Sequence, residues 1–140
     1  MIRGRPPRST AVALLQSQGL PISDITDEHL EHFFFVGYDG SPAGLVGLEL
    51  YGAVALLRSL VVGENARGNG WGSTLVEHAE RYAATKGVRS VYLLTTTAEA
   101  FFKRLGYERI DRSQSPPSIK ETREFASLCP SSSAFMTKAL

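Results

Sequence analysis

The spacing of apolar residues changes from a helical period to a strand period within the first third of the chain. Apolar residues recur every three or four positions until a glycine and a proline stop the pattern, which predicts a short helix over residues 9–19. Residues 22–33 predict a second short helix, with Asp24 or Thr26 as its N-cap. Three apolar runs of strand length follow with only short turns between them. They are typical of an antiparallel meander over residues 33–40, 42–52 and 53–62.

The remainder of the chain alternates helices with strands. Residues 72–86 carry one apolar face, and Lys86-Gly87 closes that predicted helix. The pattern then predicts a buried strand, a helix, a further strand, a loop, a short helix and a closing strand. In that order, these elements lie at residues 89–97, 98–106, 107–111, 113–118, 118–125 and 133–140.

Two capping boxes support the shorter helices of this half. Thr96 with Glu99 predicts one box, and Ser118 with Glu121 predicts another. The order of elements indicates an α/β (α+β) domain with a mixed central sheet of about six to seven strands flanked by helices. An antiparallel half is followed by a β-α-β half, and we expect a single domain over residues 1–140.

Composition narrows the function classes. The net charge is +1, so no overall field attracts nucleic acid or an anionic membrane. The basic start is followed by too short an apolar stretch for a signal peptide, and the longest apolar region is interrupted by Arg58 and cannot span a bilayer. Cys129 is the single cysteine, which excludes an internal disulfide and a multi-cysteine metal site and predicts a cytoplasmic protein without a metal.

The stretch "RGNGWG" at residues 67–72 stands between an apolar strand and a helix. A dinucleotide fingerprint needs G-x-G-x-x-G, whereas the spacing here is G-x-G-x-G, and the lysine of a Walker loop is missing. An Arg-x-x-Gly-x-Gly turn that opens a helix directs amide N–H groups and the positive end of the helix at a diphosphate. The alternative is a glycine-rich turn with a purely geometric role.

Residues 54–110 resemble the acetyl-CoA-binding core of the GNAT N-acetyltransferases, whose signature is [Gln/Arg]-x-x-Gly-x-[Gly/Ala]. Arg67, Gly70 and Gly72 occupy the signature positions. Within that family, "LLRSLVV", "YLLTTTAEAFFKRLGYERIDR" and the late "FASLCPSS" are most similar to the ArsN-type acetyltransferases often associated with arsenic-resistance operons. The resemblance implies a GNAT fold whose sheet is splayed at the acetyl-CoA site.

The resemblance also implies that acetyl-CoA is the cosubstrate. Amide groups of residues 68–73 would bind its pyrophosphate, and its pantetheine arm would pair with the strand edge at residues 60–62. The amide of Val62 or of Val61 would face the thioester oxygen. The implied cofactor-binding residues are Leu60, Val61, Val62, Arg67, Gly68, Asn69, Gly70, Trp71, Gly72 and Ser73.

The catalytic residues are less defined than the cofactor site. Many relatives carry a tyrosine as thiolate proton donor where this chain has Phe102, so water, another hydroxyl or Tyr107 would donate, or the thiolate would leave unprotonated. A two-residue hairpin loop would pair Tyr51 with Val54 and place Glu49 and Arg58 on the same strand face as Leu60 and Val62.

Two interpretations of Glu49 and Arg58 stay open. They form an internal ion pair, or Arg58 binds a carboxylate or oxyanion of the substrate while Glu49 accepts the amine proton. Thr95, Thr96 and Thr97 end a strand beside the expected cleft, one as a helix cap. We expect Cys129 to be buried and structural, and the segment 113–133 around it is a candidate specificity lid.

The sequence therefore predicts an N-acetyltransferase for a small-molecule amine. The resemblance implies an amino acid or an amino-acid analogue that carries an arsenic or phosphorus oxyacid. The alternatives are acetylation of glutamate or another ordinary amino acid, and a CoA-binding regulatory module without turnover. Since the family often dimerises, a homodimer stays open.

Overall fold

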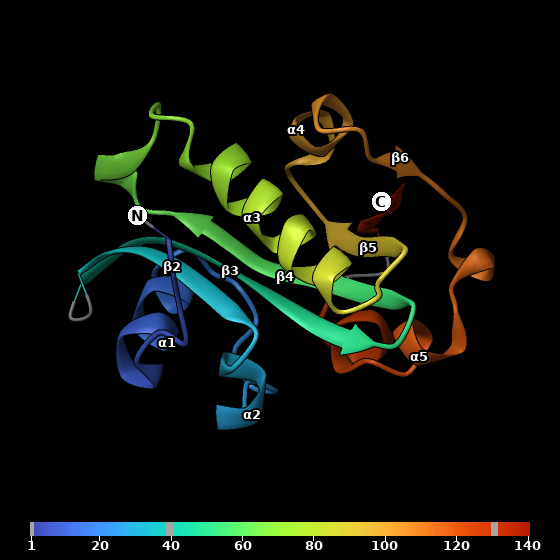
Figure 1. Cartoon of the computed structure of the whole chain (residues 1–140), viewed down its shortest axis with the longest axis horizontal. Coiled ribbons are helices and arrows are strands. Elements are labelled where there is room, and N and C mark those ends of the chain that lie inside the picture. The colour runs from blue at the N-terminus through green and yellow to red at the C-terminus, as the bar shows by residue number, and fades with distance from the viewer. Residues whose placement is uncertain (1, 39–40, 130–131) are drawn as a thin grey trace.

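A computed structural model describes residues 2–38, 41–129 and 132–140, and in these residues seven strands form one mixed sheet (Figure 1). The spatial order is β1-β2-β3-β4-β5-β7-β6, and only the β4–β5 pair is parallel among the paired strands. The strands are β1 (Arg3–Gly4), β2 (Phe33–Tyr38), β3 (Ser41–Tyr51), β4 (Val54–Val62), β5 (Ser90–Thr95), β6 (Glu108–Arg109) and β7 (Ala134–Ala139).

Helices cover both faces of the sheet. The α-helices are α1 (Arg8–Ser17), α2 (Asp27–Leu30), α3 (Trp71–Thr85), α4 (Glu99–Arg104) and α5 (Pro117–Lys120). Three short segments complete the set: the 3-10 turns η1 (Glu64–Ala66) and η2 (Arg112–Gln114), and the π-helical turn η3 (Glu124–Leu128).

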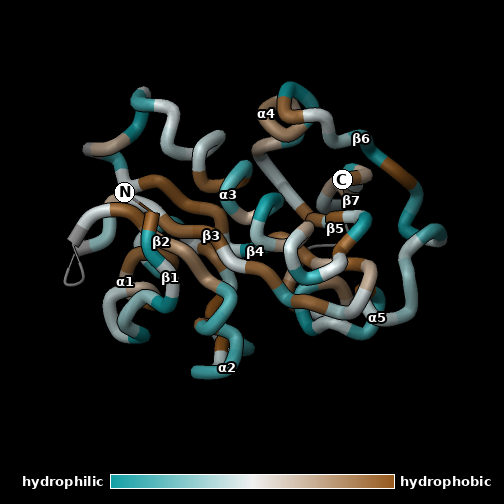
Figure 2. The backbone as a smooth tube through the Cα atoms, viewed as in Figure 1, coloured by the Kyte–Doolittle hydropathy of each residue, from teal (hydrophilic) through white to brown (hydrophobic). Residues whose placement is uncertain are grey.

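The core is divided by the sheet. Leu57 of β4 packs with α3 and with Phe102 of α4 on one face, which we call the donor face. On the opposite face, called the acceptor face, Val61 packs with α1, and Leu56 packs with Ile119 of α5. The hydropathy colouring shows the apolar strands between more polar helices and loops (Figure 2). A strand that alternates its side chains between two apolar layers explains the near-continuous apolar sequence of residues 54–62.

The structure confirms the predicted mixed α/β fold and much of its detail. Tyr51 pairs with Val54, as the two-residue hairpin predicts, and Thr26 caps α2 with His29 as its reciprocal partner. The expected strand 107–111 contains only β6, and β1 was not predicted because two residues carry no period. The predicted strand end at 39–40 and residues 130–131 of the predicted lid lie outside the described residues.

Both predicted capping boxes of the second half are wrong. Helix α4 has Ala98 at its N-cap, and the hydroxyl of Thr95, one residue before the predicted cap, accepts the Ala98 N–H at 3.0 Å. Helix α5 begins at Pro117 without a side-chain cap, because Pro117 at the first helical position fixes the helix start ahead of Ser118.

A bulge in β4 changes which residues share a face. Gly47 lies opposite Arg58 and Leu45 opposite Val61, so one residue of β3 faces two of β4, and Ser59 has a positive φ of 59°. The prediction that Glu49 and Arg58 share a face with Leu60 and Val62 is therefore wrong. The extra residue turns Leu60 and Val62 to the donor face, while Arg58 stays on the acceptor face.

The sheet opens between β4 and β5. The two strands pair only over Val54–Leu56 and Ser90–Tyr92 among the described residues. Beyond Leu56 the strand β4 continues without a partner on that side, while β5 continues to pair with β7 up to Thr95. This divergence leaves one edge of β4 accessible in the middle of the sheet.

Candidate active site

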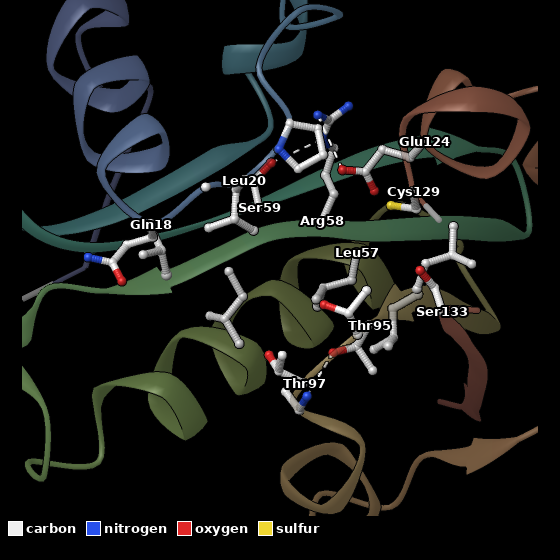
Figure 3. A pocket seen from close by; sticks show the side chains of 18 of the residues that line it. Gln18, Leu20, Leu57, Arg58, Ser59, Thr95, Thr97, Glu124, Cys129 and Ser133 are labelled. Atoms are coloured by element: carbon white, nitrogen blue, oxygen red, sulfur yellow. Dashed lines mark hydrogen bonds and ion pairs between the residues drawn. The ribbon is translucent and has the colours of Figure 1, made fainter. Parts of the chain in front are cut away.

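A cleft of about 630 Å³ lies where β4 and β5 diverge (Figure 3). Its walls come from the loop after α1, the second half of β4, the end of β5, the start of α4, and η3 with the residues after it. Because donor-face and acceptor-face residues both line it, the cleft crosses the sheet at the splay. Its lining residues that matter below are Arg58, Leu60, Val61, Val62, Arg67, Thr95, Thr96, Thr97, Phe102, Glu124, Cys129 and Ser133.

The free edge of β4 presents backbone groups to this cleft. The N–H of Gly63 donates to the Ala43 carbonyl of β3 at 2.7 Å, so Gly63 faces β3. Since backbone groups alternate along a strand, Leu60 and Val62 direct theirs away from β3, toward the cleft. The Val62 carbonyl accepts Arg67 Nε at 3.1 Å, and the Leu60 and Val62 amides lie on the same edge, beyond the described β4–β5 pairs.

The glycine-rich turn leads from Arg67 to the start of α3. Gly68 and Gly70 have φ values of 86° and 76°, which favour glycine. Gly70 is the N-cap of α3, where none of the described side chains caps the helix, and the first N–H groups of any helix have no intrahelical acceptor. Gly72 lies against the Phe101 ring, where an added Cβ would come within 3.2 Å of it.

The structure assembles part of the predicted cofactor site in the cleft itself. Residues 60–62 and Arg67 line it, and Arg67 also donates to Gln18 Oε1 at 2.7 Å. Residues 68–73 are not part of its lining and continue from its Arg67 end, exposed or half-buried. The strand edge and the uncapped helix start are thus consecutive along the chain.

Arg58 lies at the centre of a buried ionic cluster. Its side chain is fully buried, and its guanidinium donates to Asp24 through Nη1 and, at 2.8 Å, through Nη2. It also donates to Glu49 Oε2 at 2.8 Å, and Glu124 Oε1 is 3.4 Å from Nη2. Burial by itself would raise the pKa of Asp24, but the hydrogen bonds from Arg58 lower it below its usual value.

The internal ion pair between Glu49 and Arg58 is present. Glu49 accepts a further hydrogen bond from the Tyr51 hydroxyl, and burial raises the pKa of that tyrosine. Arg58 lines the cleft, whereas Glu49 is not among the lining residues and lies behind Arg58. The two predicted catalytic residues are therefore in contact, and Arg58 stands between Glu49 and the cleft.

Sequence reasoning assigned no role to Glu124, and it considered Asp24 only as a helix N-cap, a position that Thr26 occupies. Glu124 is the first residue of η3, and its carboxyl group is directed toward the Arg58 head group and the cleft (Figure 3). Burial raises its pKa to about 7, and the charges of Asp24 and Glu49 add to this effect against that of Arg58. A glutamate among the apolar residues of "EFASLC" was the available signal.

The wall opposite the ionic cluster carries hydroxyl groups. Thr95, Thr96 and Thr97 line it, and Thr95 serves as the cap-like acceptor for α4. Ser133 is 4% exposed, and its hydroxyl is buried without a hydrogen-bond partner in the described structure. A buried hydroxyl without a partner indicates a position where a bound molecule or water completes the hydrogen bond.

The remaining candidates divide into lining and remote residues. Phe102, which stands where many relatives are expected to carry a tyrosine, lines the cleft. Tyr107 is buried away from it and donates to Glu80 Oε2 at 2.9 Å, and burial raises its pKa. Cys129 lines the cleft, but burial raises the pKa of its thiol to about 11, which suppresses the thiolate.

No group of three or more His, Cys, Asp or Glu side chains among the described residues could hold a metal ion. No helix in the described ranges is both long and apolar enough to cross a membrane.

A mixed sheet, splayed beside a glycine-rich turn that opens a helix, defines the class of GNAT-like folds. A sequence model of the acetyltransferase (GNAT) family matches residues 7–107, and the chain belongs to this family. The uncharacterized N-acetyltransferase CT2212 of Chlorobaculum tepidum is 39% identical over 93 residues, which are 66% of this chain and 59% of that protein.

Solved structures share the fold over the whole chain. N-acetylglutamate synthase from Neisseria gonorrhoeae, complexed with coenzyme A and N-acetyl-glutamate, superposes with a TM-score of 0.85 at 19% identity, over 100% of this chain and 35% of that one. Rv2747 from Mycobacterium tuberculosis, solved in complex with CoA, superposes with a TM-score of 0.77 at 19% identity, over 100% of this chain and 99% of that one. The chain thus spans 59% of the curated relative and 35% of the synthase, and similarity at 19% identity shows the fold alone.

Proposed function

We propose that this protein is an acetyl-CoA-dependent N-acetyltransferase that acts on the primary amine of a small molecule. The observation that carries the proposal is the cleft at the β4–β5 splay, whose free strand edge continues through Arg67 into the uncapped start of α3. Family membership supports it, and so does the relative CT2212, which is described as an N-acetyltransferase.

In this proposal, acetyl-CoA occupies the strand edge and the helix start together. The amide groups of residues 68–73 bind the pyrophosphate, helped by the positive end of α3. The pantetheine arm lies along residues 60–62 and forms main-chain hydrogen bonds as an added strand would. Two solved structures with the same fold contain CoA, which supports this placement.

The chemistry requires a neutral amine, a positioned thioester and stabilisation of the oxyanion. The sequence left Val62 and Val61 open as the oxyanion donor, and the Gly63–Ala43 hydrogen bond favours Val62, with Leu60 as the alternative on the same edge. Phe102 cannot protonate the leaving thiolate. We therefore propose that water or a cleft hydroxyl supplies that proton, or that the thiolate leaves unprotonated.

We propose that Arg58 and Glu49 organise the acceptor end of the cleft. Arg58 is engaged by two carboxylates through three hydrogen bonds, so a substrate carboxylate would have to displace one of them. Glu49 lies behind it and would act through Arg58 or through water. This arrangement modifies the hypothesis from the sequence, in which Arg58 binds a substrate carboxylate directly and Glu49 accepts the amine proton directly.

For the acceptor, we propose an amino acid or an amino-acid analogue with an arsenic or phosphorus oxyacid, on the resemblance to ArsN-type enzymes. N-acetylation of glutamate is the second candidate, favoured by the N-acetyl-glutamate in the structure of the synthase that shares this fold. A cytoplasmic location is proposed from the single cysteine. A homodimer is proposed from the family's tendency to dimerise.

A panel of amines tests the acceptor and separates an enzyme from a CoA-binding module. Purified protein is incubated with acetyl-CoA and each amine, including ordinary amino acids and their arsenic and phosphorus analogues, and the N-acetyl product is identified by mass spectrometry. A preferred amine defines the acceptor. Tight binding of CoA together with no product from any amine would instead support a regulatory module.

A further inference from the structure

The ionic cluster around Arg58 has more negative than positive groups. One guanidinium faces the carboxyl groups of Asp24, Glu49 and Glu124, all buried. Asp24 and Glu49 are hydrogen-bonded to it, whereas Glu124 makes only the longer contact of 3.4 Å to Nη2, which Asp24 already occupies. Because three carboxyl groups face one guanidinium, the positive charge of a cation bound in the cleft next to Glu124 would be stabilised.

Of the three carboxyl groups in the cluster, Glu124 is the one that lines the cleft directly. It lines the cleft together with Arg58, Cys129 and Ser133, and Glu49 does not. Figure 3 shows its carboxyl group on the acceptor-face wall, across from Thr95 and Thr97. Ser133 lines the same cleft, and its buried hydroxyl has no hydrogen-bond partner among the described residues, which is an independent indication that a polar molecule binds in the cleft.

The backbone around Glu124 supports a functional position. Residues 124–128 form a π-helical turn, a rare conformation that is frequent at functional sites. The turn is held firmly, because Phe125 packs edge-on against Phe135 with ring centroids 5.3 Å apart, and Ile119 of α5 is fully buried. Residues 124–129 of the predicted lid thus contribute a wall of the cleft, in which Glu124 takes part.

We propose that Glu124 is a catalytic residue of the acetyl transfer proposed above, which binds the acceptor as a primary ammonium ion and removes its proton. The ammonium supplies the cation that the cluster lacks. One proton passes from nitrogen to the Glu124 carboxylate, and the neutral amine forms an N–C bond to the thioester carbon as the C–S bond breaks. The nitrogen loses its second proton to the departing thiolate through water, and Glu124 returns its proton to solvent.

The acid–base properties of the site suit this step. The charged and titratable groups that face Glu124 are Arg58 from β4, Asp24 from the segment before α2, Glu49 from β3 and Cys129 from the end of its own turn. Burial, Asp24 and Glu49 hold the pKa of Glu124 near 7, so the carboxylate is present at neutral pH and is basic enough to accept a proton.

The experiment compares Glu124→Gln with Glu121→Gln, an exposed glutamate just before the same turn, over pH 5.5 to 9. We expect kcat/KM of the wild type and the control to fall below about pH 7, and Glu124→Gln to lose that limb together with at least about 100-fold in rate. Glu124→Asp should keep the limb at a reduced rate. Binding of CoA, measured by calorimetry, should be the same in all four proteins.

The proposal is overturned if Glu124→Gln keeps kcat/KM within about twofold of the wild type and retains the acid limb. A loss of rate with an unchanged limb would likewise overturn it, because a merely structural carboxyl group does not set the pH profile. If the wild type binds CoA but acetylates no amine, the proposed transferase activity itself is wrong, and this inference falls with it.

Discussion

Arg58 is the residue on which the acceptor end depends. Its guanidinium is fully buried and is bonded to Asp24 and Glu49, and it approaches Glu124 at 3.4 Å. Burial opposes its charge, but the hydrogen bond with Asp24 and the neighbouring carboxylates raise its pKa above the usual value, so it stays charged. A buried charge of this kind is costly to leave without its partners.

Replacing Arg58 with Met should destabilise the protein by about 3 to 5 kcal/mol at pH 8, since it leaves the three carboxyl groups without a cation. The loss should shrink at pH 5, where the unpaired carboxyl groups take up protons. Urea unfolding at the two pH values measures both effects. A loss under about 1 kcal/mol at pH 8 would show that Arg58 does not organise this cluster.

Glu124 should make stability depend on pH in the opposite sense to a salt-bridged acid. Because its pKa is raised from 4.5 to about 7 in the folded protein, folding is favoured while it is protonated, and that contribution is lost as pH rises from about 4.5 to 7. Glu124→Gln keeps the neutral form and leaves Arg58 its bonds to Asp24 and Glu49.

The Gln variant should therefore be more stable than the wild type above pH 7, by about 3 kcal/mol, and similar to it near pH 4.5. Thermal unfolding across pH 4.5 to 8.5 gives the comparison. A Gln variant that is less stable than the wild type at pH 8 would contradict a raised pKa of Glu124 in the folded protein.

Ser133 separates binding from stability. Its hydroxyl has no hydrogen-bond partner among the residues that the structure describes, so Ser133→Ala should change the free energy of unfolding by less than about 1 kcal/mol. If the hydroxyl bonds the acceptor, the same change should raise the acceptor KM by roughly 5- to 10-fold and leave the KM for acetyl-CoA unaltered. Equal KM values for the acceptor in both proteins would remove Ser133 from the binding site.

The contact between Glu49 and Arg58 could be predicted from the sequence, but the other members of the cluster, Asp24 and Glu124, could not. The pair follows from a two-residue hairpin, which fixes the register locally. Asp24 is 34 positions from Arg58, and Glu124 comes from a π-helical turn with no period in the sequence. Tertiary packing alone brings these two carboxyl groups to Arg58.

Among the elements, the turn before α3 carries the proposed donor site. Its Arg-x-x-Gly-x-Gly spacing and the helix that follows are readable from the sequence, because glycines with positive φ and an apolar helical period are local features. The bulge at Ser59 is not readable in this way. One extra residue in β4 exchanges the faces of everything after it, which is why the face prediction for Leu60 and Val62 failed.

Gly70→Ala tests the helix start. Gly70 has a φ of 76°, where alanine is strained, so the change should destabilise the protein by about 1 kcal/mol and turn the amides of the first helical residues. We expect the KM for acetyl-CoA to rise about tenfold or more. Gly87→Ala is the matched control, because Gly87 has a φ of 87° at the other end of the same helix.

The control should lose similar stability but keep the KM for acetyl-CoA. A similar rise of that KM in both variants would attribute the effect to general strain, and no rise in Gly70→Ala would remove the turn from the cofactor site.

For the molecule as a whole, the meander, the β-α-β unit and the closing strand follow from periodicity, and the structure has all of them. The insertion of β7 between β5 and β6 is a long-range arrangement that no local pattern specifies. The cleft itself results from two such facts, the early end of the β4–β5 ladder and the packing of residues 124–129 beside it. Function in this fold therefore depends on where strands separate as much as on the motif.

Amine-dependent release of CoA thiol from acetyl-CoA is the decisive measurement for the proposed acetyl transfer. With the best acceptor of the panel, we expect thiol release that is saturable in amine and acetyl-CoA, equal in amount to the N-acetyl product, and well above the hydrolysis seen without amine. Thiol release that never exceeds this hydrolysis, in a protein that still binds CoA, would contradict the proposed acetyl transfer.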